Sequence, residues 1–195
     1  MPTITALRAA RPGRVEVELD GAPWRTLPVE AVLRAGLAAG RLLDRPRARL
    51  LRRELRRLEA LSAAGRALRG RDLAAAELAH RLERAGVAPR PRAETLAVLD
   101  RAGLVDDRRF ASDRSAALAE RGYGEAWIRW DLERRGVAAE LVESAIEVLV
   151  DERSRVGRIL EERGGGARVA RMLARRGFGE DAVELAANAP VAASG

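Results

Sequence analysis

The chain of 195 residues contains no cysteine and no lysine, and only 3% of its residues are aromatic. Without cysteine it can form no disulfide, thiolate metal site or thiol nucleophile. Without lysine it can form neither a Walker A phosphate site nor a Schiff base, and all 36 basic residues are arginines. It has no apolar signal region and no run near the ~18 apolar residues of a membrane span. We therefore expect a cytoplasmic protein that does not enter a membrane and has an aliphatic core.

The positive charge is concentrated in one short stretch. The chain has a net charge of +7, and residues 44–58 alone carry seven arginines against two acidic residues. Leu51, Leu55 and Leu58 recur with helical spacing, which predicts an amphipathic helix with arginines on its other side. That side contains Arg49, Arg52, Arg53, Arg56 and Arg57. These arginines could contact phosphates or an acidic protein, or they could simply face solvent.

The first 43 residues have a different pattern. Residues Arg14 to Leu19 alternate polar with apolar side chains and lead into Asp20-Gly21, a strong hairpin signal. This pattern predicts a β-hairpin or three-stranded ribbon between about residues 4 and 27. A short helix should follow Pro28, because proline suits the first helical position.

One template occurs three times along the chain. Its copies are Leu78-x3-Leu82-x3-Gly86-Val87, Ile128-x3-Leu132-x3-Gly136-Val137 and Val169-x3-Leu173-x3-Gly177-Phe178. Each predicts a helix with two large apolar residues one turn apart, ended by a glycine in the left-handed conformation. Predicted helices flank every copy, and the spacing between the glycines falls from 50 to 41 residues.

The predicted fold is therefore mainly α, an elongated array of three tandem three-helix repeats with a small N-terminal β element, the third repeat being shortened. The expected parts are the β element with a short helix (1–43), the arginine-rich connecting helix (44–58), the repeats (59–103, 104–150 and 151–187) and a flexible tail (188–195).

Two segments separated by eight residues resemble the signature of the RecX family of regulatory proteins. They are "GLVDDRRFA" (103–111) and "ERGYGEAWIRWDLERRGV" (120–137), and the third copy ends in the related "LARRGF". The chain departs from the family pattern at Ala74, where the family tends to place a serine as helix cap. Asp72 is the alternative cap, since aspartate is a good N-cap and alanine a poor one.

The resemblance implies a non-catalytic regulator of homologous recombination and DNA repair. It implies binding to the RecA filament on single-stranded DNA, with inhibition of ATP hydrolysis, strand exchange and repressor cleavage by that filament. We expect a monomer with no cofactor and no metal, and contact with the single-stranded DNA itself stays open.

Three features could suggest catalysis or ligand binding, and each has a simpler interpretation. Asp106-Asp107 fits a helix start, where aspartate caps free N–H groups. His80 is the only histidine and has no second ligand-type residue at metal spacing. The glycine run 164–166 follows a helix instead of a strand, so we expect a helix break there.

Trp127 and Trp130 lie opposite the Ile128/Leu132 side of their predicted helix, with Arg134 beside them. The equivalent residues of the third copy are Arg168, Arg171 and Arg175. Two tryptophans with arginines have the composition of a binding hot spot for RecA or DNA. The alternative is that the tryptophans pack against a neighbouring helix.

Two other functions remain possible from the sequence. The chain could be an arginine-rich helical protein that binds DNA independently of RecA, or a helical-repeat scaffold that binds peptides.

Overall fold

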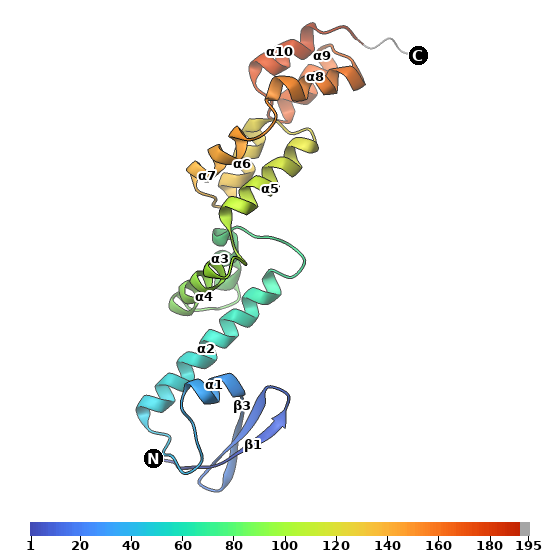
Figure 1. The fold of residues 1–195 in the computed structure, drawn as a ribbon. Helices are drawn as coiled ribbons and strands as arrows, with labels where there is room; N and C mark the ends of the chain where they lie inside the picture. Colours follow the sequence, from blue (N-terminus) through green and yellow to red (C-terminus); the bar gives the residue numbers. More distant parts are fainter. Residues whose placement is uncertain (192–195) are drawn as a thin grey trace. The chain divides into compact units, whose positions relative to one another are not determined.

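The computed structural model describes residues 1–191, which contain three strands and ten helices (Figure 1). Residues 192–195 of the expected tail lie outside the described residues. The elements are β1 (Ile4–Arg11), β2 (Arg14–Leu19), β3 (Ala22–Pro28), α1 (Val29–Arg34), α2 (Arg45–Ala67), α3 (Ala75–Arg84), α4 (Pro89–Arg101), α5 (Asp107–Glu120), α6 (Glu125–Arg134), α7 (Ala139–Glu147), α8 (Glu152–Arg163), α9 (Ala167–Arg175) and α10 (Glu180–Asn188). The predicted class, mainly helical with a small N-terminal sheet, is confirmed.

The chain forms two compact units, which are described separately. Met1–Arg69 with Ala79–Val98 forms the first unit, and Gly70–Leu78 with the chain from Leu99 onward forms the second.

The N-terminal sheet has β2 between β1 and β3, with both pairings antiparallel. The β2–β3 turn is Asp20-Gly21, whose φ angles are +49° and +82°. Two consecutive positive φ angles are what a tight type I′ hairpin requires. One side of the sheet buries Ile4, Val17 and Leu27 in a core shared with α1 and α2. The predicted three-stranded ribbon is thus present.

Helix α2 is a single helix of 23 residues, so it contains both the arginine-rich stretch and the segment expected to start the first repeat. Its N-cap is Asp44, whose side chain accepts a hydrogen bond from the backbone N–H of Arg47 at 2.8 Å. Leu51, Ala60 and Ala64 are buried along one side. The apolar side of α2 therefore stays continuous across the expected boundary at residue 58.

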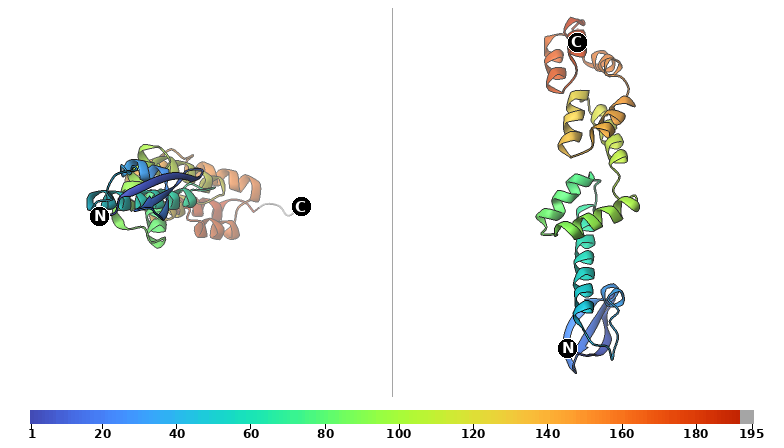
Figure 2. Two further views of the ribbon diagram at one scale, coloured as in Figure 1. Left: turned by 90° about the horizontal axis from the view of Figure 1, so that it is seen from below. Right: turned by 90° about the vertical axis from the view of Figure 1, so that its left-hand side faces the viewer.

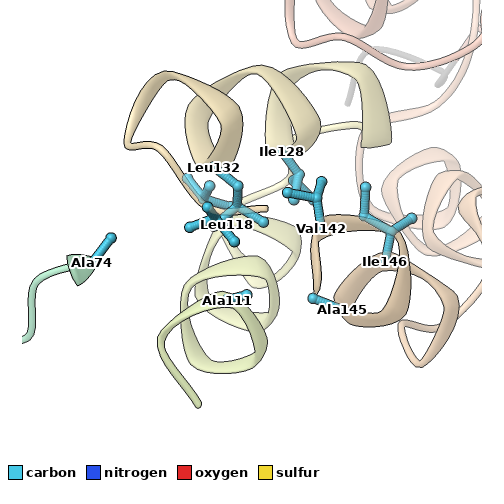
Figure 3. Packing of buried hydrophobic residues seen from close by; sticks show 9 residues of the cluster. Ala74, Ala111, Leu118, Ile128, Leu132, Val142, Ala145 and Ile146 are labelled. Carbon is cyan, nitrogen blue, oxygen red and sulfur yellow. The ribbon is translucent and has the colours of Figure 1, made fainter. Parts of the chain in front are cut away.

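The second unit contains two three-helix groups, each with its own core. In the first group, Leu118 of α5, Ile128 and Leu132 of α6, and Val142 of α7 pack together (Figure 3). In the second, α8 to α10 pack around residues that include Leu173, and both views of Figure 2 show these helices together. Helices α8 to α10 have 12, 9 and 9 residues, against 14, 10 and 9 in α5 to α7.

The three template glycines end their helices as expected. Gly86, Gly136 and Gly177 have φ angles of +78°, +79° and +76°. At the end of α6, the N–H of Val137 donates to the carbonyl of Leu132 at 3.2 Å and the N–H of Gly136 donates to that of Glu133 at 2.8 Å. These are the two bonds of a Schellman motif, and they recur after α3 and α9.

Two of these glycines also lie where neighbouring groups of helices meet. A Cβ atom on Gly136 would lie 2.5 Å from the Cβ atom of Ala76, at the start of α3. A Cβ atom on Gly177 would lie 2.5 Å from the backbone nitrogen of Trp127, at the start of α6. At both positions glycine is needed for the close approach as well as for the turn.

Carboxylates reach across the same junctions. Asp107 accepts a hydrogen bond from the backbone N–H of Ala75 at 2.7 Å. Glu152 accepts from the N–H of Glu125 at 2.7 Å and from that of Gly179 at 2.8 Å. The backbone N–H of Ala75 at the start of α3 is thus capped by Asp107 of the later helix α5. Asp72, the alternative cap expected from the sequence, does not bind this N–H.

Candidate functional site

Helix α6 has one buried and one exposed side. Ile128 and Leu132 are fully buried, whereas Trp127 is 37% exposed and Trp130 is 49% exposed. Apolar residues at this spacing lie on one face of a helix, and the tryptophans lie on the other. Both tryptophans are thus partly exposed, and Trp127 also lies close to Gly177 of the neighbouring group of helices.

Three aromatic rings contact one another in sequence, that of the partly buried Tyr123 just before α6 and those of Trp127 and Trp130 on it. Tyr123 stacks on Trp127 with 5.4 Å between ring centroids and 21° between planes, and Trp127 meets Trp130 at 5.0 Å and 48°. The guanidinium carbon of Arg134 lies 4.9 Å from the centroid of Trp130. We call Tyr123, Trp127, Trp130 and Arg134 the aromatic ladder. Aromatic and cation–π contacts of this kind hold side chains in place that would otherwise be mobile.

A buried acidic residue lies on the same helix. Asp131 accepts hydrogen bonds from Arg114 and from Arg135, each at 2.9 Å from Nε to Oδ2. Burial alone would raise the pKa of Asp131, but the hydrogen bonds and charges of the two arginines outweigh it, and the pKa lies below its usual value. Arg135 also donates to Glu77 at 3.0 Å, so this network joins α6 to α3.

The arginines of α9 extend the positive charge of the second unit. Arg168, Arg171 and Arg175 are all exposed. Within residues 1–191 none of the three forms an ion pair, and α9 itself contains no acidic residue. These groups are therefore available to an external partner with negative charge.

The arginine side of α2 is a separate surface, in the first unit. Four of its predicted members, Arg49, Arg52, Arg53 and Arg56, are exposed. The fifth, Arg57, is half-buried and forms ion pairs with Glu54 at 2.9 Å and with Glu30 of α1. Arg57 thus forms its contacts within the protein, and its contact with Glu30 could not be predicted from the sequence.

The residues that could have suggested catalysis or ligand binding are Asp106, His80 and the glycine run 164–166. Asp106 caps α5 by accepting from the N–H of Arg109 at 3.0 Å. His80 is exposed, with Nδ1 3.7 Å from a carboxylate oxygen of Glu83. The glycine run separates α8 from α9, so the predicted helix break is confirmed. Among the described residues no group of three or more histidine, aspartate or glutamate side chains could hold a metal ion.

Two buried or half-buried arginines were not found from the sequence. Arg155 is 5% exposed and donates to the carbonyl of Tyr123 at 2.7 Å, and burial lowers its pKa although Glu152 and Glu125 oppose this. Arg176 donates to the carbonyl of Arg121 at 3.2 Å. The doubled arginine before the glycine, in "RRGV" and "RRGF", could have indicated Arg135 and Arg176, because both occupy the same template position.

Comparisons with known proteins agree with the resemblance. Residues 106–146 match the family model described as RecX, second three-helix domain. A regulatory protein RecX from Halorhodospira halophila is 35% identical over 137 residues, which are 65% of this chain and 85% of the relative. The chain belongs to the RecX family. This membership supports a regulatory role.

Solved structures resemble this RecX-family chain in fold. A crystal structure of regulatory protein RecX matches with a TM-score of 0.79 at 18% identity and covers 95% of this chain and 98% of its own. The structure of RecX from Lactobacillus salivarius matches with a TM-score of 0.60 at 16% identity and covers 68% of this chain and 94% of its own. Among the described residues, no helix has the length and apolar character needed to cross a membrane.

Proposed function

We propose that the chain binds the RecA filament on single-stranded DNA and lowers its ATP hydrolysis, strand exchange and coprotease activity. It would act in the cytoplasm, as a regulator of homologous recombination, DNA repair and the SOS response, without covalent chemistry of its own. The observation that carries the proposal is an exposed cluster of tryptophans and arginines in a member of a regulatory family.

The composition of this surface supports binding by contact. Binding energy at protein interfaces concentrates in a few tryptophan, tyrosine and arginine side chains. The aromatic ladder supplies these residue types on α6 and just before it, and three exposed arginines lie on α9. Because the ladder residues already contact one another, ordering them on binding would cost little entropy.

The test is RecA ATPase on single-stranded DNA, measured while this protein is titrated in. We expect the ATPase rate to fall, and Trp127→Ala/Trp130→Ala to require at least about tenfold more protein for the same fall. Trp24→Ala is the matched control, since Trp24 is also an exposed tryptophan, at 38%, but lies on β3 in the other unit. If the wild-type protein left the ATPase rate unchanged, the function would be wrong; if the double variant acted like the wild type, the surface would be wrong.

A second candidate function, DNA binding independent of RecA, is favoured by the exposed arginines of α2. If all four contact phosphates of single-stranded DNA, the logarithm of the binding constant should fall against the logarithm of salt concentration with a slope of about −3. Binding of oligo(dT) without RecA, measured by fluorescence anisotropy at several salt concentrations, gives this slope. Tight binding with that slope, together with an unchanged RecA ATPase rate, would favour the second candidate over the first.

A further inference from the structure

The rings of the aromatic ladder already contact neighbouring side chains. Trp127 lies between Tyr123, with centroids 5.4 Å apart, and Trp130, with centroids 5.0 Å apart. Tyr123 precedes the first residue of α6 and is stacked on Trp127, whereas Trp130 lies one turn further along α6 and its ring is tilted by 48°. One face of Trp127 is therefore covered by Tyr123.

The ends of the ladder are covered by arginines. Arg134, four residues further along α6, lies over Trp130 with its guanidinium carbon 4.9 Å from the ring centroid. Arg121 and Arg176 each lie 5.7 Å from the ring centroid of Tyr123. Proteins that bind single-stranded nucleic acid through aromatic residues offer free ring faces on which bases stack. Here Arg134 lies over Trp130 and Tyr123 is stacked on Trp127, at positions that a base would otherwise take.

What the ladder does present to solvent is the guanidinium group of Arg134. Its side chain is 56% exposed, and its only ion pair within residues 1–191 is a contact of 3.8 Å with Asp131, which is longer than a hydrogen bond. A guanidinium stacked on a ring keeps its N–H groups in its own plane, where they can bind both oxygens of a carboxylate. The exposed arginines of α9 add positive charge to the same compact unit.

We infer that the aromatic ladder is a docking surface for an acidic segment of a protein partner, with Arg134 as its carboxylate-binding group, and not a platform for DNA bases. The inference rests on the proposed function, in which that partner is the protein surface of the RecA filament. The ring edges of Trp127 and Trp130 would supply apolar contact beside the ion pair.

The experiment compares two binding partners, free oligo(dT) and RecA filaments assembled on oligo(dT) with a non-hydrolysable ATP analogue. A Trp24→Phe background leaves Trp127 and Trp130 as the only tryptophans, so their fluorescence reports on the ladder. We expect Arg134→Ala to weaken filament binding about tenfold, and Arg134→Lys to weaken it nearly as much, because lysine keeps the charge but lacks the planar fork. Affinity for free oligo(dT) should change less than about twofold, without quenching of tryptophan fluorescence.

Arg25→Ala is the control, since Arg25 lies over Trp24 at 5.9 Å in the other unit and should not affect filament binding. Unchanged melting temperatures would show that the variants are folded. Quenching by free oligo(dT), together with weaker DNA binding by Arg134→Ala, would make the ladder a DNA platform and overturn the inference. Filament binding by Arg134→Ala equal to that of the wild type would also overturn it, while leaving the proposed function intact. Failure of the wild-type protein to bind filaments would overturn both.

Discussion

Glycine is needed at the junctions for two reasons, a positive φ angle and close approach to a neighbouring backbone. Three glycine substitutions in the second unit test these reasons separately. Gly103 has a φ of +64° and nothing within 4 Å of a Cβ atom, so Gly103→Ala tests backbone strain alone. Gly124 has an ordinary φ of −82°, but its Cβ atom would overlap the carbonyl oxygen of Gly177, so Gly124→Ala tests close approach alone. Gly177→Ala combines a φ of +76° with a Cβ atom 2.5 Å from the backbone nitrogen of Trp127.

The expected losses in free energy of unfolding differ accordingly. Gly103→Ala should cost about 1 kcal/mol, the lower end of the left-handed penalty. Gly124→Ala should cost about 2–4 kcal/mol, since overpacking adds about 1–3 kcal/mol and the bond from the N–H of Gly124 to the carbonyl of Arg176, now 2.8 Å, would lengthen. Gly177→Ala should cost more than Gly103→Ala, about 2–5 kcal/mol, because the left-handed penalty of about 1–2 kcal/mol and overpacking of about 1–3 kcal/mol act there together.

Urea unfolding followed by tryptophan fluorescence measures these losses. In a Trp24→Phe background the signal comes from Trp127, which lies next to Gly177, and from Trp130, which contacts Trp127. Circular dichroism on the same samples would show whether the helices unfold in the same transition. Equal losses for Gly103→Ala and Gly177→Ala would refute the reasoning, because close approach would then contribute nothing.

Two further substitutions on α6 test its buried side. Leu132→Ala should lower the free energy of unfolding by about 2–5 kcal/mol, because the side chain is fully buried. Val148→Ala is the control and should cost almost nothing, because Val148 is 75% exposed. A near-zero loss for Leu132→Ala in urea unfolding would contradict the packing. Asp131 has a lowered pKa, so its ion pairs stabilise the folded state above the unfolded pKa of about 3.9 and are lost as pH falls through the lower folded value. Asp131→Asn should be less stable than the wild type near neutral pH and should lose less stability than the wild type below about pH 4. If the melting temperatures of the two proteins fell in parallel with pH, the prediction would be wrong.

Local features of the fold could be predicted from the sequence, and contacts between distant residues could not. The hairpin at Asp20-Gly21 and the helix ends at Gly136 and Gly177 depend on residues a few positions apart, so their patterns are visible in the chain. By contrast, the bond from Ala75 to Asp107 joins residues 32 positions apart. Nothing in helical periodicity indicates which side chain from a later helix will reach an exposed helix start.

The candidate site shows the same difference between local features, which could be predicted, and contacts that depend on packing, which could not. Periodicity placed Trp127 and Trp130 opposite the core, and both are exposed. The stacking of the rings on one another depends on side-chain rotamers, and the ion pair of Arg57 with Glu30 depends on how α1 packs on α2; neither is set by spacing along the chain. The exposed surface could therefore be located from the sequence, but its geometry could not.

Backbone hydrogen bonds cross the junction between the group of α5 to α7 and the group of α8 to α10. The N–H of Gly124 donates to the carbonyl of Arg176 at 2.8 Å and the N–H of Ala126 donates to that of Gly177 at 3.1 Å. Backbone bonds are the same for every residue type except proline, so mutations in the surrounding side chains leave them in place. As the family diverges, surface residues such as those of the ladder can change to suit a different partner, and the junction can persist provided that its glycines are kept.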